Sequence, residues 1–246
     1  MTAANRKTSL ASGVRGEPDR PVVWLAGDLD ATSAGQLITA VSKALLDQPR
    51  SLVIDMSRIR VLDRLALTSL ISVHHQAAAW PGCPLAISGA DTPTRGGLRV
   101  MGINRYVPMY RDVPEALRRV SSLPPAPRVR EHLPPTTQAI EIARDRVREV
   151  CARWRVSDLE QAAQSVVTEL VANAVAHAGA GVEVALTRTR AHLHIAVRDQ
   201  SREPPRRLIG DESGGYGLKL VEAFATTWGY NPTAGGKIVW AAIRIR

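Results

Sequence analysis

Short apolar runs alternate with amphipathic stretches along the first half of the chain. Each run is bounded by polar residues or glycine, as is typical of a strand. The expected strands lie at residues 21–26, 52–56, 85–88 and 106–110. Elsewhere, apolar residues recur three and four positions apart, which predicts helices. The expected helices lie at residues 34–47, 63–79, 93–101 and 114–120. This alternation predicts an α/β domain whose helices pack on a sheet.

The pattern changes after a proline-rich segment, SSLPPAPRVREHLPP, at residues 121–135. Because proline fixes φ and lacks an N–H group, we expect an extended, semi-rigid spacer here. The polar N-terminal segment carries no periodicity and is expected to be a flexible tail. The expected organisation is a tail at 1–20, a first domain at 21–122, a linker at 123–135 and a second domain at 136–246.

Helices precede strands in the second half. Helical spacing covers residues 136–154 and 157–177, and a hairpin is expected from strands at 181–189 and 192–198. A further helix at 218–227 and a last strand at 237–245 complete the pattern. Leading helices followed by a largely antiparallel sheet predict an α+β sandwich.

Composition adds only general limits. Apolar residues make up 45% and charged residues 22% of the 246 residues, which is typical of a globular protein. No stretch of 18 apolar residues predicts a membrane span, and the N-terminal segment lacks the apolar core of a secretion signal. Cys83 and Cys151 lie in no metal-binding or disulfide spacing. We therefore expect a cytoplasmic protein without membrane association.

The net charge of +9 does not by itself indicate a nucleic-acid binder. Positive charge is spread almost evenly over the two halves, whereas such proteins usually concentrate it on one face or arm. Aromatic residues total 4%, so stacking platforms for bases are scarce. Nucleic-acid binding remains the weakest of the functional alternatives.

Three polar residues stand four positions apart in the second helix of the second half: Glu169, Asn173 and His177. On a helix they form one polar line opposite an apolar face. A carboxylate beside an amide oxygen suits a hydrated Mg²⁺ ion that carries phosphates, or a general base with a helper. A solvated helix face fits the same pattern equally well.

Two further features follow along the chain. Asp199 ends a strand, where its carboxylate could accept a hydrogen bond from the amino group of a base or form an ordinary turn. The segment Ser213-Gly-Gly215-Tyr-Gly217-Leu218 then opens a helix. Glycines before a helix N-terminus let backbone N–H groups approach phosphate oxygens, although an ordinary loop has the same composition.

In this order and spacing, these residues resemble the ATPase domain shared by DNA gyrase, sensor histidine kinases and mismatch-repair proteins, the Bergerat fold. Within that group, residues 136–246 are most similar to the anti-sigma-factor serine kinases of bacteria, down to the closing segment from Gly235 to Trp240. The resemblance implies that the domain binds ATP and Mg²⁺ and acts as a protein serine/threonine kinase.

The resemblance also implies residue roles. Asn173 would hold Mg²⁺, Glu169 would be the catalytic base, and Asp199 would recognise the adenine amino group. Gly215 and Gly217, with Leu218 at the helix start, would complete the nucleotide site beneath a lid at about 202–214. The chain departs from the family pattern Asp-x-Gly-x-Gly, because Ser201 and Glu203 stand where the glycines are expected.

The first half resembles the STAS domain of anti-sigma-factor antagonists, over about residues 21–123. The supporting features are Gly27-Asp-Leu-Asp30 after the first strand, and Val53-Ile-Asp-Met-Ser57 followed by Val61-Leu-Asp63. In that family a serine or threonine at the following helix start is phosphorylated. Leu65 occupies this position here and has no hydroxyl group, so the domain is not expected to be phosphorylated there.

The two resemblances together imply a bacterial partner-switching regulator. Its partners would be a sigma factor, an STAS-domain antagonist or both, and a homodimer is one of the assemblies left open. A tethered STAS domain that cannot be phosphorylated would act as a built-in pseudosubstrate or docking module, at an effective concentration on the order of millimolar. The main alternative is a nucleotide-dependent partner-binding module without phosphoryl transfer.

Overall fold

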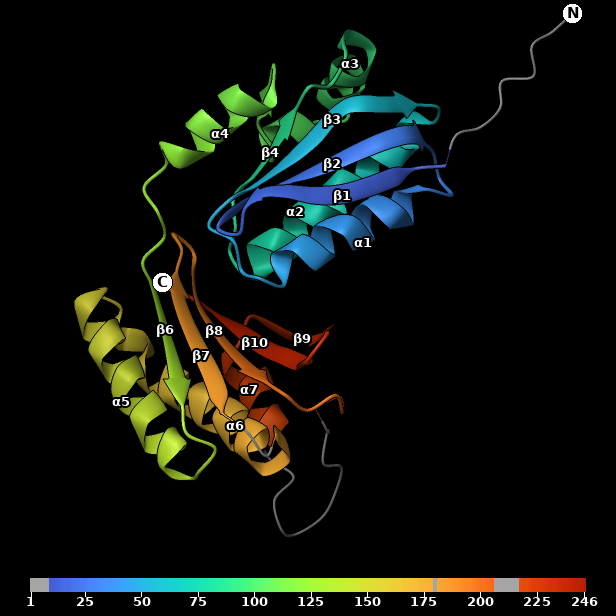
Figure 1. Cartoon of the computed structure of the whole chain (residues 1–246). Helices are drawn as coiled ribbons and strands as arrows, with labels where there is room; N and C mark the ends of the chain where they lie inside the picture. The colour runs from blue at the N-terminus through green and yellow to red at the C-terminus, as the bar shows by residue number, and fades with distance from the viewer. Residues whose placement is uncertain (1–8, 179–180, 206–216) are drawn as a thin grey trace, which may run out of the picture. The chain divides into compact units, whose positions relative to one another are not determined.

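The chain forms two compact units, which divide between Pro125 and Ala126 (Figure 1). The computed structural model describes residues 9–178, 181–205 and 217–246. Each unit is built on one five-stranded sheet. The first unit is an α/β arrangement and the second an α/β sandwich with an antiparallel sheet, so the expected fold classes are confirmed.

The sheet of the first unit has the strand order β1-β2-β3-β4-β5. β1 pairs antiparallel with β2, and every later pair is parallel. The strands are β1 (Ala11–Glu17), β2 (Arg20–Leu29), β3 (Leu52–Val61), β4 (Leu85–Ser88) and β5 (Met109–Tyr110). Parallel neighbours need crossover connections, which the intervening helices provide.

In the described part of this unit, three helices and two short 3-10 helices connect the strands, and a fourth helix follows β5. They are α1 (Ala34–Leu45), η1 (Arg64–Thr68), α2 (Ser69–Ala79), α3 (Thr92–Val100), η2 (Ile103–Arg105) and α4 (Val113–Ser121). Asp91 and Asp112 cap α3 and α4 by accepting a backbone N–H from the first turn at 2.8 Å in each case. On α4, Ala116 and Val120 are buried against one residue from each of three neighbouring strands: Val22, Val53 and Ala86.

The expected flexible tail over residues 1–20 is wrong for its second half, because β1 occupies Ala11–Glu17. β1 pairs with β2 along its whole length, from Ala11 opposite Ala26 to Glu17 opposite Arg20. It lies at the edge of the sheet and its residues are mostly exposed. An exposed edge strand needs little apolar surface, so it carries no hydrophobic pattern that the sequence could reveal.

The second unit has the strand order β6-β7-β8-β10-β9, and all neighbours are antiparallel. Its elements are β6 (Arg128–Leu133), α5 (Gln138–Arg153), η3 (Ser157–Leu159), α6 (Glu160–Ala178), β7 (Val182–Arg188), β8 (His192–Asp199), α7 (Gly217–Phe224), β9 (Thr227–Thr233) and β10 (Gly236–Arg244). Helices and sheet share one buried core, which includes Val147, Val167, Ile195 and Val221.

Two strands of this unit were not expected. β6 lies where the linker was expected, between the prolines at 127 and 134, so the prolines flank the strand and interrupt none of its hydrogen bonds. β9 begins at Thr227, where a helix was expected to end, and it contains Pro232. Both are edge strands, the position in which proline and polar residues are tolerated. Among the described residues, no helix combines the length and apolar character of a membrane span.

Candidate functional site

A buried ion pair lies at the C-terminal end of β8. Lys237 of β10 lies directly opposite Asp199 in the strand ladder, and its Nζ is 3.1 Å from Oδ1 of Asp199. The Asp199 and Lys237 side chains are 1% and 3% exposed. The backbone N–H of Ser201 also donates to Oδ1, at 2.7 Å. Asp199 is thus held by one of its two oxygens.

The other oxygen, Oδ2 of Asp199, is buried and has no hydrogen-bond partner in the part of the chain that the structure describes. A buried acceptor without a donor costs about 1–3 kcal/mol, so such groups are rare in folded proteins. An N–H group of a bound ligand would remove this cost. The unpartnered oxygen therefore fits the role of recognising the amino group of a base.

Gly236 lets β10 approach this strand end closely. Its φ is +155°, and a Cβ atom there would lie 2.0 Å from the carbonyl oxygen of Asp199. Any side chain would push the two strands apart. The glycine therefore allows Lys237, the next residue, to reach Asp199.

Glu169 and Asn173 lie on α6, which contacts β8, β10 and α7 (Figure 1). The apolar side of α6 is in the core, with Val166, Val167 and Leu170 at most 1% exposed. Glu169 and Asn173 are half-buried, and within the described residues no ion pair or side-chain hydrogen bond joins either of them to another residue.

Glu169 and Asn173 therefore lie one turn apart on the same helix, as expected from the sequence. The side chain of His177 lies outside the described residues. Asp199 forms an ion pair with Lys237 and accepts a hydrogen bond from Ser201. Glu169 and Asn173 lie on α6, the helix that packs against β8 and β10.

The glycine segment is only partly described. Gly217 is the first residue of α7, and Leu218 is half-buried in its first turn. Gly215 and all but the first four residues of the expected lid at 202–214 lie outside the described residues. At the start of the lid, the N–H of Glu203 donates to Oγ of Ser201 at 3.3 Å. Polar groups thus order the turn at the positions where the related family has glycines.

A metal site made of protein ligands alone does not form in the described ranges, since no three His, Cys, Asp or Glu residues gather there. Mg²⁺ commonly keeps several waters and takes only one or two protein ligands beside substrate phosphates. The amide oxygen of Asn173 fits such a single ligand.

In the first unit, Leu65 is 70% exposed in η1. The two nearby hydroxyl groups are engaged with the backbone. Thr68 donates to the carbonyl oxygen of Leu65 and Ser69 to that of Ala66, each at 2.6 Å. Ser69 is also buried, whereas Leu65, which has no hydroxyl group, is exposed.

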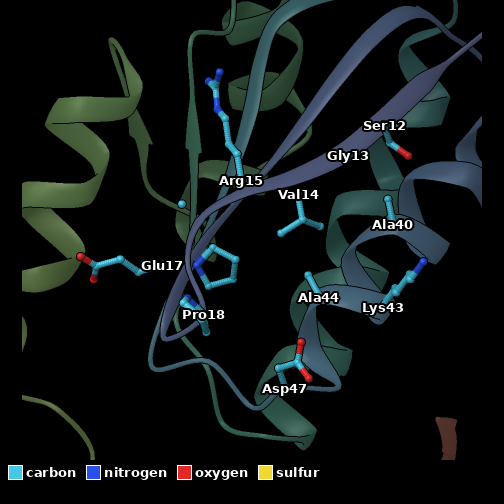
Figure 2. A pocket seen from close by; sticks show the side chains of 12 residues that line it. Ser12, Gly13, Val14, Arg15, Glu17, Pro18, Ala40, Lys43, Ala44 and Asp47 are labelled. Atoms are coloured by element: carbon cyan, nitrogen blue, oxygen red, sulfur yellow. The ribbon is translucent and has the colours of Figure 1, made fainter. Parts of the chain in front are cut away.

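A cavity of about 520 Å³ lies between β1 and α1 in the first unit. Figure 2 shows Val14 of β1 facing Ala40 and Ala44 of α1 across it, with Lys43 and Asp47 at its rim. The sequence did not indicate this cavity, because its wall depends on β1.

Comparisons with known families match both halves. Residues 12–111 match the family described as Mlab, STAS domain, and residues 133–243 match the histidine kinase-like ATPase domain. The chain therefore carries an N-terminal STAS domain and a C-terminal histidine kinase-like ATPase domain, as the sequence motifs predicted. The second of these implies ATP binding. No curated protein sequence matches the chain.

Several solved structures are similar to part of the chain. An anti-sigma factor antagonist from Mycobacterium paratuberculosis is 22% identical, with 50% of this chain and 100% of that chain covered and a TM-score of 0.42. The unphosphorylated anti-sigma factor antagonist SpoIIAA of Bacillus is 17% identical, with 46% and 99% covered and a TM-score of 0.39. RsbS from Moorella thermoacetica is 23% identical, with 46% and 96% covered and a TM-score of 0.39.

Sequence reasoning missed Lys237. A signal was present, since Lys237 is the one charged residue among the apolar residues that open β10. A lysine in a buried strand needs a counter-charge, and Asp199 was the natural candidate once the pairing of β8 with β10 was known.

Proposed function

We propose that this chain is an ATP-binding regulator of the partner-switching type, with the activity of an anti-sigma-factor serine/threonine kinase. The observation that carries the proposal is the buried, unpartnered Oδ2 of Asp199 in a histidine kinase-like ATPase domain. That atom is suited to accept the amino N–H of adenine. The position of Glu169 and Asn173 on the neighbouring helix α6 also supports the proposal.

Each residue has a defined task in this proposal. Asn173 would hold Mg²⁺ by its amide oxygen, and the N-terminus of α7 at Gly217 would favour phosphate groups through its backbone N–H groups. Glu169 would accept the proton of the attacking hydroxyl group as general base. When bound, Mg·ATP supplies the γ-phosphoryl group and the metal charge that stabilises its transfer.

The STAS domain would dock partners without receiving phosphate. Leu65 presents an exposed apolar side chain at the position where the related antagonists carry the phosphorylated hydroxyl group. The acceptor is therefore expected on another protein, an STAS-domain antagonist, while a sigma factor is the partner whose release is controlled.

One alternative has specific support: nucleotide-dependent partner binding without phosphoryl transfer. Ser201 and Glu203 replace the glycines of the related family, and a hydrogen bond between them orders the turn at the lid. A turn held by this hydrogen bond would rearrange less readily around a bound triphosphate. In this case nucleotide binding would remain and transfer would be absent.

Isothermal titration of the full chain with ATP, with and without Mg²⁺, tests the proposal. Wild type is expected to bind Mg·ATP, and Asn173→Ala to lose the Mg²⁺-dependent part of the affinity. Gln161→Ala, at an exposed position of the same helix, is the matched control and should bind as wild type does. Absence of ATP affinity up to millimolar concentration in wild type would refute the proposal. Incubation with labelled ATP and candidate STAS proteins then separates the kinase from the alternative.

A further inference from the structure

Lys237 is an unusual residue for its place in the fold. It stands at the start of β10, followed by the buried residues Ile238 and Val239, and is itself 2% exposed. Removing an ammonium group from water is costly unless a counter-charge and good geometry compensate. In the described part of the chain, the counter-charge is Asp199.

The two donors around Asp199 act on the same atom. Lys237 Nζ and the Ser201 N–H group both approach Oδ1, at 3.1 and 2.7 Å. Oδ2 receives no hydrogen bond from the described residues. The carboxylate is therefore fixed in orientation, with one oxygen anchored and the other left as a bare acceptor.

We propose that Lys237 is the positioning residue that sets base specificity in the nucleotide site. By anchoring Oδ1, it keeps Oδ2 of Asp199 as a hydrogen-bond acceptor only. Adenine has an amino group at position 6, which can donate a hydrogen bond to that oxygen. Hypoxanthine has a carbonyl group at position 6, so two acceptors would face each other. The inference rests on the proposed function, since it concerns the same site.

The physical argument is one of unmatched polar groups. A site built to receive a hydrogen bond rejects an analogue that cannot supply it, because buried groups stay unpaired. Without Lys237, the carboxylate loses its counter-charge, and a buried carboxylate without a neighbouring cation favours its neutral form. A neutral carboxyl group can donate as well as accept, so it tolerates a carbonyl group at position 6.

The test compares ATP with inosine triphosphate, which carries the carbonyl group, by isothermal titration in Mg²⁺. Wild type is expected to prefer ATP by about 10- to 100-fold, the range set by one unmatched buried hydrogen bond. Lys237→Met should bring the preference close to one, and Lys237→Arg, which keeps the positive charge, should restore most of it. Lys43→Met makes the same change at an exposed position of α1 and should leave the preference at the wild-type value.

A second variant keeps the test valid if Lys237→Met fails to fold. The double change Asp199→Asn with Lys237→Met buries no charge, and neutral replacement of a buried ion pair is usually tolerated. It should melt cooperatively and bind the two nucleotides about equally. A wild-type ATP preference in either Lys237→Met or the double variant would overturn the inference.

Failure of the inference is distinguishable from failure of the proposed function. If wild type binds ATP with the expected preference and Lys237→Met keeps it, only the role of Lys237 is wrong. If wild type binds neither nucleotide while Lys237→Met binds ATP, the ion pair blocks the site, which overturns the inference. If neither form binds either nucleotide, the proposed function falls together with it.

Discussion

Asp63 accepts the backbone N–H of Leu65 at 2.9 Å and so caps the 3-10 helix in which Leu65 is 70% exposed. This local geometry is independent of the residue 65 side chain, because the hydrogen bond uses only its backbone. A serine at this position would therefore sit in the same capped turn, with its hydroxyl group in solvent.

Leu65→Ser is accordingly expected to gain a phosphate at residue 65 when the full-length variant is incubated with ATP, Mg²⁺ and the wild-type chain. A helix N-terminus tolerates the added negative charge. Mass spectrometry of the digested chain reads the modification directly, and wild type should carry none.

Arg64→Ser is the control for this gain, because it adds a hydroxyl group one residue earlier on the same exposed segment. It should remain unmodified. Phosphate on Thr68 or Ser69 of wild type would contradict the proposal that the STAS domain receives no phosphate.

Glu169→Gln should leave ATP affinity within about twofold of wild type, since the change keeps the size of the side chain and removes only its basicity. Phosphoryl transfer to the Leu65→Ser acceptor should slow by about 10²–10⁴-fold, the usual contribution of a general base. Glu160→Gln, at the start of the same helix, should transfer at the wild-type rate. Equal rates in Glu169→Gln and wild type would exclude Glu169 as the base.

Lys237→Ala is expected to lower the free energy of unfolding by about 3–5 kcal/mol, because it leaves the Asp199 carboxylate buried without its counter-charge. The double variant Asp199→Asn with Lys237→Met should lose much less. Urea denaturation followed by circular dichroism measures both. If the single and double variants were equally unstable, packing and not charge would explain the loss.

Cys151 lies in the buried core of the second unit, and its thiol should make the stability of that unit depend on pH. Its burial, with smaller contributions from Glu160 and Asp158, raises the pKa of the thiol from 9.0 to about 11. Above pH 9 the unfolded chain releases this proton while the folded chain keeps it, so the stability of wild type should fall as pH rises from 9 to about 11.

Cys151→Val lacks the titrating thiol and is the reference for this effect. The difference in unfolding free energy between wild type and Cys151→Val should change in favour of the variant across that pH window, and stay constant below it. A difference that is independent of pH would show that the thiol titrates alike in both states.

The hydrophobic pattern was sufficient to predict the elements that bury an apolar face. β4 matches its expected range of 85–88, and α5 and α6 lie within a few residues of theirs. The order and spacing of Glu169, Asn173 and Asp199 likewise carried the resemblance to the ATPase family, because a helix repeat and a strand end are local features of sequence. Where burial is one-sided and local, the sequence carries the information by itself.

Edge strands and long-range pairs were decided only by the tertiary structure. β1, β6 and β9 are edge strands that bury little, so none of them shows an alternation of apolar and polar residues. Prolines beside β6 and within β9 also argued against a strand. The Asp199–Lys237 ion pair joins residues 38 positions apart in the chain. Its existence depends on the register of β8 with β10, and that register is favoured by the packing of β7, β8 and β10 on α6.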